Sequence, residues 1–216
     1  MTSADHLIRK ARSEPAYAAV ATWKQILETD PFNLEAVYSI AECLVETGKY
    51  SESIQYLNRL REVSVNLANK LEQRFRQGSY AMCDIANRYL EDGLIEQARS
   101  SFEQARELMP KNVDCYVGLG RVALHENNLE LAERYFRFGL SIEQDNHFAL
   151  LGMGDVRIES QPESAIDFFT RAIEISPTEP YSYYQRAKAF AKLGKIIESN
   201  SDLEQARRLR ISNSHD

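Results

Sequence analysis

Small and large apolar residues recur along the chain at helical spacing. A small residue is followed four positions later by a large apolar one in six pairs: Ala19/Trp23, Ser53/Leu57, Ala98/Phe102, Ala132/Phe136, Ala165/Phe169 and Ser199/Leu203. The first members of successive pairs lie 34, 45, 34, 33 and 34 residues apart. Because residues three, four and seven positions apart share one helix face, the pattern predicts amphipathic helices at a regular interval.

A second helical pattern and a set of turn residues complete each interval. The pattern large-x-x-apolar-small-x-x-large lies upstream of the last five pairs, as in Val37, Ile40, Ala41 and Leu44. Turn residues precede four of the small residues by five positions: Gly48, Gly93, Asn127 and Gly194. Pro follows the aromatic residue by eight positions in three pairs: Pro31, Pro110 and Pro177. Gly and Asn suit the left-handed end of a helix and Pro suits a helix start, so each interval is predicted to hold two helices.

This period and these residue types resemble the tetratricopeptide repeat, whose signature is W-x2-L-G-x2-Y, then A-x3-F, then P. The resemblance covers residues 4–210 and implies an all-α fold, a right-handed superhelical solenoid of antiparallel helix pairs. We expect a single domain, residues 1–216, with about six repeat units and a frayed tail at 211–216. The expected units are 4–31, 34–64, 68–110, 113–144, 147–177 and 180–210.

The 45-residue interval holds 11 residues more than the repeat period, which is close to three helical turns. Apolar residues in this stretch keep helical spacing at Leu67, Ala68, Leu71 and Phe75. We therefore expect a lengthened first helix in the third unit, from about residue 66 or 68 to about residue 91, with Gly78 as a possible kink. A disordered loop is the alternative.

Composition and charge narrow the class of protein. A hydrophobic content of 44% and a charged content of 27% are ordinary for a folded soluble protein. The net charge of −6 argues against a nucleic-acid partner. Residues after 177 hold 7 Lys/Arg and 5 Asp/Glu, so the acidic excess lies in the earlier part. Three widely spaced cysteines favour a reducing, cytoplasmic location. The sequence contains no run of about 18 apolar residues, so we expect no transmembrane helix.

Motifs for catalysis or cofactor binding are weak. Gly118-x-Gly120 and Gly152-x-Gly154 look like phosphate-binding loops, but they fall inside predicted helices at the small packing position. His125-Glu126 lacks the second His of a metalloprotease helix, and no nucleophile elbow is present. We therefore expect no enzyme activity, no catalytic residues, no metal site and no cofactor.

The resemblance implies that the first helices line a concave groove. In such repeats the second, fifth, ninth, twelfth and thirteenth positions of each unit face it. The candidate partner-binding residues at these positions are Tyr38, Glu42, Tyr80, Asn87, Arg121, Phe148, Asp155, Tyr181, Tyr184 and Lys188. Exposed aromatic residues with a few placed charges suit protein binding. The alternative is that Tyr80, Phe148 and Tyr181 pack between neighbouring units.

One ligand class is disfavoured. Chaperone-binding relatives hold a terminal carboxylate with Lys, Asn and Arg at set groove positions. In the corresponding places this chain has Tyr38, Glu42, Asp84, Asp114 and Gly118. We therefore do not expect a carboxylate-terminated chaperone tail as the ligand.

The leading hypothesis is a protein–protein interaction module, an adaptor or scaffold that binds a peptide or helix of a partner protein in the groove. The first alternative is a self-assembling structural scaffold and possible homo-oligomer, because no capping helix follows the last unit and its final helix, about residues 196–209, has one uncovered side. The second is a non-catalytic helical-repeat subunit of an enzyme complex. No membrane or nucleic-acid partner is expected.

Overall fold

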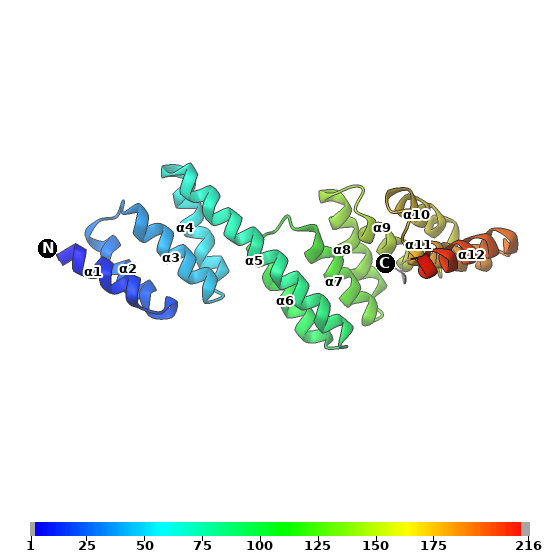
Figure 1. The fold of residues 1–216 in the computed structure, drawn as a ribbon, viewed down its shortest axis with the longest axis horizontal. Helices are drawn as coiled ribbons and strands as arrows, with labels where there is room; N and C mark the ends of the chain where they lie inside the picture. Colours follow the sequence, from blue (N-terminus) through cyan, green and yellow to red (C-terminus); the bar gives the residue numbers. More distant parts are fainter. Residues whose placement is uncertain (1–2, 213–216) are drawn as a thin grey trace. The chain divides into compact units, whose positions relative to one another are not determined.

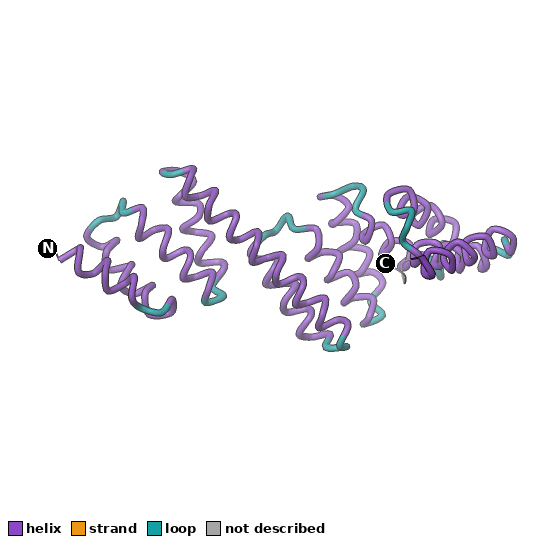
Figure 2. The backbone as a smooth tube through the Cα atoms, viewed as in Figure 1, coloured by secondary structure: helices purple, strands orange, loops and turns teal. Residues whose placement is uncertain are grey.

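The computed structural model describes residues 3–212, and all regular structure in this range is α-helical (Figures 1 and 2). Twelve helices follow one another: α1 Ser3–Ser13, α2 Ala16–Thr29, α3 Leu34–Glu46, α4 Tyr50–Val63, α5 Val65–Glu91, α6 Ile95–Leu108, α7 Val113–His125, α8 Leu129–Ile142, α9 His147–Arg157, α10 Pro162–Ile175, α11 Pro180–Lys192 and α12 Ile196–Ser212. Consecutive helices pack in sequential pairs, consistent with about six repeat units. The all-α prediction is confirmed.

The helices divide into two compact bodies. The N-terminal body contains the chain up to Asp84 together with Gln104–Pro110. The C-terminal body contains Ile85–Glu103 and the chain from Lys111 onward. Two of the three boundaries fall inside helices, so α5 and α6 each contribute residues to both bodies, and the third lies in the turn between α6 and α7.

Asparagine side chains start several of the first helices. Asn33 accepts a hydrogen bond from the backbone amide of Ala36 in α3, and Asn146 accepts one from Ala149 in α9. Asn112 plays the same part at the start of α7. These caps satisfy amide groups that have no partner within the helix.

In four helix pairs, a residue in the left-handed backbone conformation lies in the turn between the two helices. Asn127 has a φ of 57°, and three glycines share the positive φ: Gly48, Gly93 and Gly194. These are the four residues that the sequence marks as turns, and their left-handed conformation is confirmed. Residues other than Gly, Asn and Asp would be strained in this conformation.

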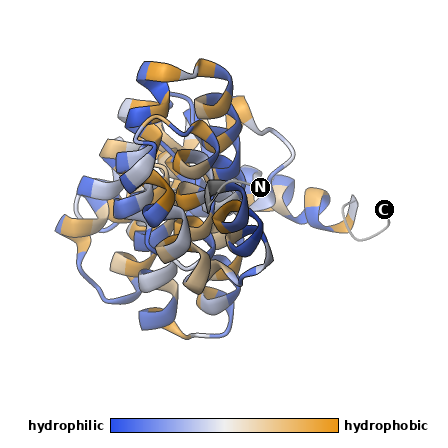
Figure 3. Cartoon of the chain, turned by 90° about the vertical axis from the view of Figure 1, so that its left-hand side faces the viewer, coloured by the Kyte–Doolittle hydropathy of each residue, from blue (hydrophilic) through white to orange (hydrophobic). Residues whose placement is uncertain are grey.

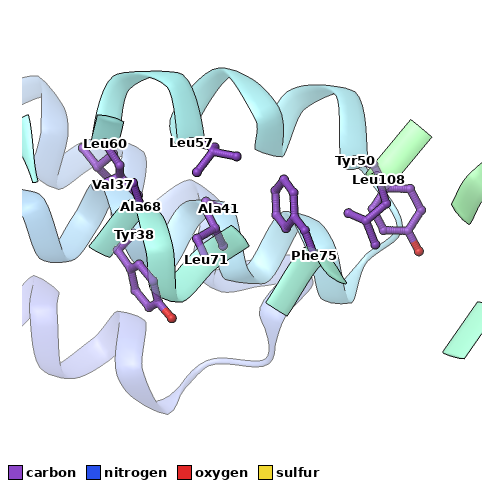
Figure 4. Packing of buried hydrophobic residues seen from close by; sticks show 10 residues of the cluster. All are labelled: Val37, Tyr38, Ala41, Tyr50, Leu57, Leu60, Ala68, Leu71, Phe75 and Leu108. Atoms are coloured by element: carbon purple, nitrogen blue, oxygen red, sulfur yellow. The ribbon is translucent and has the colours of Figure 1, made fainter. Parts of the chain in front are cut away.

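The first half of α5 belongs to the core of the N-terminal body. Figure 4 shows Ala68, Leu71 and Phe75 of this helix packed with Val37 and Leu57 of α3 and α4. Residues 65–77, for which the sequence leaves a helix and a disordered loop open, form the first turns of α5, and the helix continues through Gly78. The added turns therefore bury apolar side chains.

Each helix of a pair has an apolar and a polar face. Figure 3 shows hydrophobic and hydrophilic residues alternating along individual helices. The small residues that mark the repeat, Ala98, Ala132 and Ala165, are fully buried. This burial agrees with the prediction that they lie where helix axes approach closely.

Phenylalanine rings pack on bare glycine backbone in the C-terminal body. Phe136 of α8 lies against Gly120 of α7 and Gly152 of α9, and a Cβ atom on Gly152 would lie 2.3 Å from the ring. The same relation holds in two further contacts: Gly118 with Phe102 and Gly154 with Phe169. The two G-x-G motifs are therefore helix-packing positions, as predicted, and not phosphate loops.

The sequence predicts a frayed tail from residue 211. Ile211 and Ser212 instead belong to α12, and residues 213–216 lie outside the described part of the chain. At the other end, α1 begins at Ser3, one residue before the expected start of the first unit, 4–31.

A matched pair of glycine substitutions tests the ring packing. Gly152→Ala should lower the free energy of unfolding by about 1–3 kcal/mol, because the methyl group overlaps the buried Phe136 ring. Gly139→Ala in α8 should raise it by up to about 1 kcal/mol, since its Cβ meets only ordinary contacts, the nearest at 3.5 Å, and Ala favours the helix. Urea unfolding followed by circular dichroism measures both. If both substitutions changed the free energy of unfolding in the same direction, the packing of the Phe136 ring on Gly152 would be contradicted.

Candidate protein-binding cleft

A cleft of about 690 Å³ opens in the C-terminal body. Its walls come mainly from α7 and α9, with contributions from α5, α11 and the turn before α11. Five of the ten predicted groove residues line it: Asn87, Arg121, Phe148, Asp155 and Tyr181. The spacing of the repeat therefore brings these side chains together from four different helices.

Helix α7 shows how the sequence builds one wall. The five groove positions of its repeat unit all line the cleft: Asp114, Val117, Arg121, Leu124 and His125. Their separations of three, four, three and one residue keep them on one helix face. Gly118 and Gly152 also line the cleft, and the rings of Phe102 and Phe136 take the space that their side chains would occupy.

A hydrogen-bond network surrounds the carboxylate of Asp155. The Tyr181 hydroxyl donates to Oδ2 at 3.1 Å, and the Gln185 amide donates to Oδ1 at 2.5 Å. Gln185 Nε2 also donates to the Tyr181 hydroxyl at 2.9 Å. Burial raises the pKa of Asp155, while these hydrogen bonds and the charge of Lys188 oppose the rise. Burial likewise raises the pKa of Tyr181, and the neighbouring Asp155 raises it further.

Gln185 is the one member of this network that the sequence reasoning does not propose. It occupies the sixth position of its repeat unit, which is not among the groove positions. The sequence does contain a signal for Gln185, because this residue lies four positions after Tyr181 and therefore shares its face of α11.

The charges of the cleft are predominantly negative. Asp114, Asp155 and Glu179 line it, against a single cation at neutral pH, Arg121. The guanidinium of Arg121 donates to Asn87 Oδ1 at 2.9 Å. The cleft therefore suits a ligand with a positive charge.

Phe148 is the most exposed of the aromatic residues that line the cleft. It is 61% exposed and follows the N-cap of α9 by two positions. Its ring meets the His147 ring edge-on, with 5.2 Å between the centroids. His147 is half-buried, and its Nδ1 hydrogen-bonds the carbonyl of Ala172 at 3.0 Å. His147 thus supports the ring of Phe148 from one side.

Two predicted residues of α11 lie elsewhere in the C-terminal body. Tyr184 lines a second groove, between α11 and α12. The Lys188 ammonium lies 5.8 Å from the centroid of the Tyr184 ring. Neither residue lines the cleft of α7 and α9.

The remaining three predicted residues belong to the N-terminal body. Tyr38 is buried, and its hydroxyl donates to Glu42 at 2.9 Å. Burial, followed by the bond to Glu42, raises the pKa of Tyr38 to about 12. Lys70 and Arg74 of α5 cover this pair, with Lys70 over the ring and Arg74 bound to Glu42 at 3.2 Å. Tyr80 is exposed on α5.

Other kinds of site have no basis in residues 3–212. This part of the chain has no group of three or more His, Cys, Asp or Glu side chains placed to hold a metal ion. Its helices include none that is both long and apolar enough to cross a membrane. No disulfide joins the cysteines in this part of the chain, and burial raises the pKa of the Cys43 thiol.

Consecutive helix pairs stacked through aromatic and small residues define a helical-repeat protein. Two tetratricopeptide repeat profiles match the sequence, over residues 17–64 and 89–152, together just over half of the chain. The chain belongs to the tetratricopeptide repeat family, and the resemblance seen in the sequence is confirmed.

Three curated proteins are similar to the chain. It is 22% identical, over 84% of its length, to anaphase-promoting complex subunit 3 of Schizosaccharomyces pombe. It is 23% identical over 92% to the CTR9 homolog of Arabidopsis thaliana, and 26% identical over 87% to Hsp70-Hsp90 organizing protein 3 of the same plant. The chain spans 26%, 18% and 32% of these proteins, about a third or less of each.

Solved structures show the same fold. The Cut9–Hcn1 hetero-tetramer of the anaphase-promoting complex matches 95% of the chain with a TM-score of 0.57 and 21% identity, over 45% of that chain. MamA matches the whole chain, over 99% of its own, with a TM-score of 0.52 and 15% identity. The first tetratricopeptide domain of Spaghetti (RPAP3), bound to the HSP90 peptide SRMEEVD, matches 55%, over 94% of that chain, with a TM-score of 0.50 and 16% identity.

The buried carboxyl group of Asp155 should give the stability a specific pH dependence. Its pKa is higher in the folded chain than the ordinary 3.8, so the folded state holds this proton more tightly than the unfolded state does. The contribution of Asp155 to stability is therefore greatest below pH 3.8 and declines as the pH rises to the raised pKa.

The comparison with Asp155→Asn isolates this effect from the other carboxyl groups. The wild-type chain should lose stability relative to the variant as the pH rises from about 4 to 7. Urea unfolding of both proteins across this range measures the difference. A difference that grows in favour of the wild type would show that hydrogen bonds, and not burial, dominate at Asp155.

Proposed function

We propose that the chain is a protein–protein interaction module, an adaptor or scaffold that holds a segment of a partner protein in the cleft of the C-terminal body. One observation carries the proposal: Phe148 is 61% exposed at a cleft that also contains Asp114 and Asp155. An exposed aromatic side chain beside fixed charges is typical of the residues that dominate binding energy at protein interfaces.

The charge of the cleft indicates the chemistry of the ligand. Asp114, Asp155 and Glu179 outnumber Arg121, and Arg121 already binds Asn87. An acidic ligand would face repulsion in this cleft, whereas a Lys or Arg side chain would meet carboxylates on two helices. We therefore propose a segment that presents a basic residue next to an apolar one, with the apolar side chain against Phe148.

Similar proteins support the general role. Tetratricopeptide repeat proteins commonly mediate protein–protein interactions. Among the similar solved structures, Spaghetti is bound to an HSP90 peptide, and YrrB has an unusual peptide-binding site. The HSP90 peptide SRMEEVD ends in acidic residues. The cleft described above is itself acidic, so we propose a ligand of opposite charge.

The cleft favours binding over catalysis, because its polar side chains are engaged with one another. Asp155 is bound by Tyr181 and Gln185, and Arg121 by Asn87. We propose a cytoplasmic location, since three widely spaced cysteines, with no disulfide among residues 3–212, suit a reducing compartment.

Peptide selection followed by binding measurements tests the proposal. A library of random peptides selected on the immobilised chain should yield sequences with Lys or Arg beside an apolar residue. Fluorescence anisotropy should then show that Phe148→Ala weakens the binding of these peptides by about tenfold or more, as expected for loss of a central aromatic contact.

Phe32→Ala is the matched control, because Phe32 is a highly exposed phenylalanine outside the cleft. The control should bind the selected peptides as the wild type does. Enrichment of acidic peptides, or equal affinity in the Phe148→Ala variant, would show that the cleft is not the binding site.

A further inference from the structure

The last helix pair has an open groove on its outer side. This groove, of about 1030 Å³, lies between α11 and α12 and borders the cleft of α7 and α9, with which it shares Glu179 and Tyr181. Its principal lining residues are Tyr184, Leu203, Ala206, Arg207, Arg210 and Ile211.

The register of the repeat shows that this surface is normally covered. Leu203 occupies in α12 the position that Phe136 occupies in α8 and Phe169 in α10. Both phenylalanines are fully buried, whereas Leu203 is 41% exposed. The sequence pattern assigns Leu203 to packing, and its exposure results from the absence of a neighbour after α12 in the described chain.

A residue on the first helix of the pair repeats this observation. Tyr184 occupies in α11 the position of Val117 in α7 and Leu151 in α9. Val117 and Leu151 are buried, but Tyr184 is 48% exposed. In the two preceding pairs the covering element is a helix, since α9 packs on α7 and α8, and α11 packs on α9 and α10. A helix therefore fits the open surface of α11 and α12.

The charges on this surface favour one kind of helix. In the two preceding pairs the position of Arg207 holds the half-buried apolar residues Leu140 and Ile173, whereas the second and third units have Arg61 and Arg106 there. Arg207 and Arg210 have no carboxylate partner among residues 3–212, whereas Arg208 on the neighbouring face pairs with Glu204. Glu179 also lines the groove, but its carboxylate caps α11 by accepting from the Tyr181 amide.

We infer that the outer surface of α11 and α12 docks an amphipathic helix of a partner protein, with apolar residues against Leu203 and Tyr184 and acidic residues facing Arg207 and Arg210. A second copy of this chain fits less well. In a two-fold dimer the same patch meets itself, and the arginines of one copy would approach those of the other.

The inference is independent of the cleft, because it depends on residues of α12 that the cleft does not contain. It assigns to the chain a second contact surface, of basic character, on the last helix pair that the structure describes.

Nuclear magnetic resonance of the isotope-labelled chain tests the inference directly and detects weak binding. The probe is a helix-stabilised peptide of about four turns with leucines on one face and glutamates along its borders. A second peptide replaces every glutamate with lysine. The glutamate peptide should shift the amide signals of Tyr184, Leu203 and Ala206, and its affinity should exceed that of the lysine peptide by about tenfold or more.

Two charge-reversal variants complete the test. Arg207→Glu should weaken binding of the glutamate peptide by about tenfold and improve binding of the lysine peptide. Arg134→Glu, at an exposed site on α8, should leave both affinities unchanged. Because both side chains are exposed, neither variant should unfold the chain.

Three results would overturn the inference. The first is the absence of shifts on α11 and α12 at millimolar peptide. The second is equal binding of the two peptides, which would remove the role of the arginines. The third is a concentration-dependent dimer that Leu203→Glu dissociates in sedimentation experiments, which would make a second copy the occupant of this surface.

Discussion

The packing of phenylalanine rings on bare glycine backbone determines how closely the helices of the C-terminal body approach. Phe136 lies between Gly120 of its own helix pair and Gly152 of the next. A glycine inside a helix costs about 1 kcal/mol relative to alanine. Full burial of a phenylalanine side chain contributes about 1.5–3 kcal/mol, which offsets this cost. The same close approach lets α7 and α9 contact each other, and these two helices form the main walls of the cleft.

Local rules in the sequence account for most of the fold. Helix pairs, left-handed turn residues and buried small residues all follow from spacing and residue type, because each depends on neighbours within one repeat. The same spacing puts the five groove positions of α7 on one helix face, and all five line the cleft. The sequence is less informative about the burial of a side chain when that burial depends on residues from another helix pair.

Tyr38 and Tyr184 illustrate this limit. Both occupy the fifth position of a repeat unit, so the sequence treats them alike. Tyr38 is buried because the added turns of α5 supply neighbours, among them Lys70 over its ring. Tyr184 is exposed because no helix covers it in the described chain. Gln185 escaped prediction for a related reason, since its role depends on the position of Asp155 in another helix pair.

The lengthened helix α5 shows how a repeat array can change length without losing its pattern. Eleven added residues advance a helix by about three turns, so the residues on either side of the added block keep nearly the same orientation. Tyr80, Cys83 and Asn87 thus keep the sequence positions of an ordinary repeat. A single added residue would instead rotate everything after it by about 100°. Such a helix can therefore grow only in discrete steps, each a near-whole number of turns.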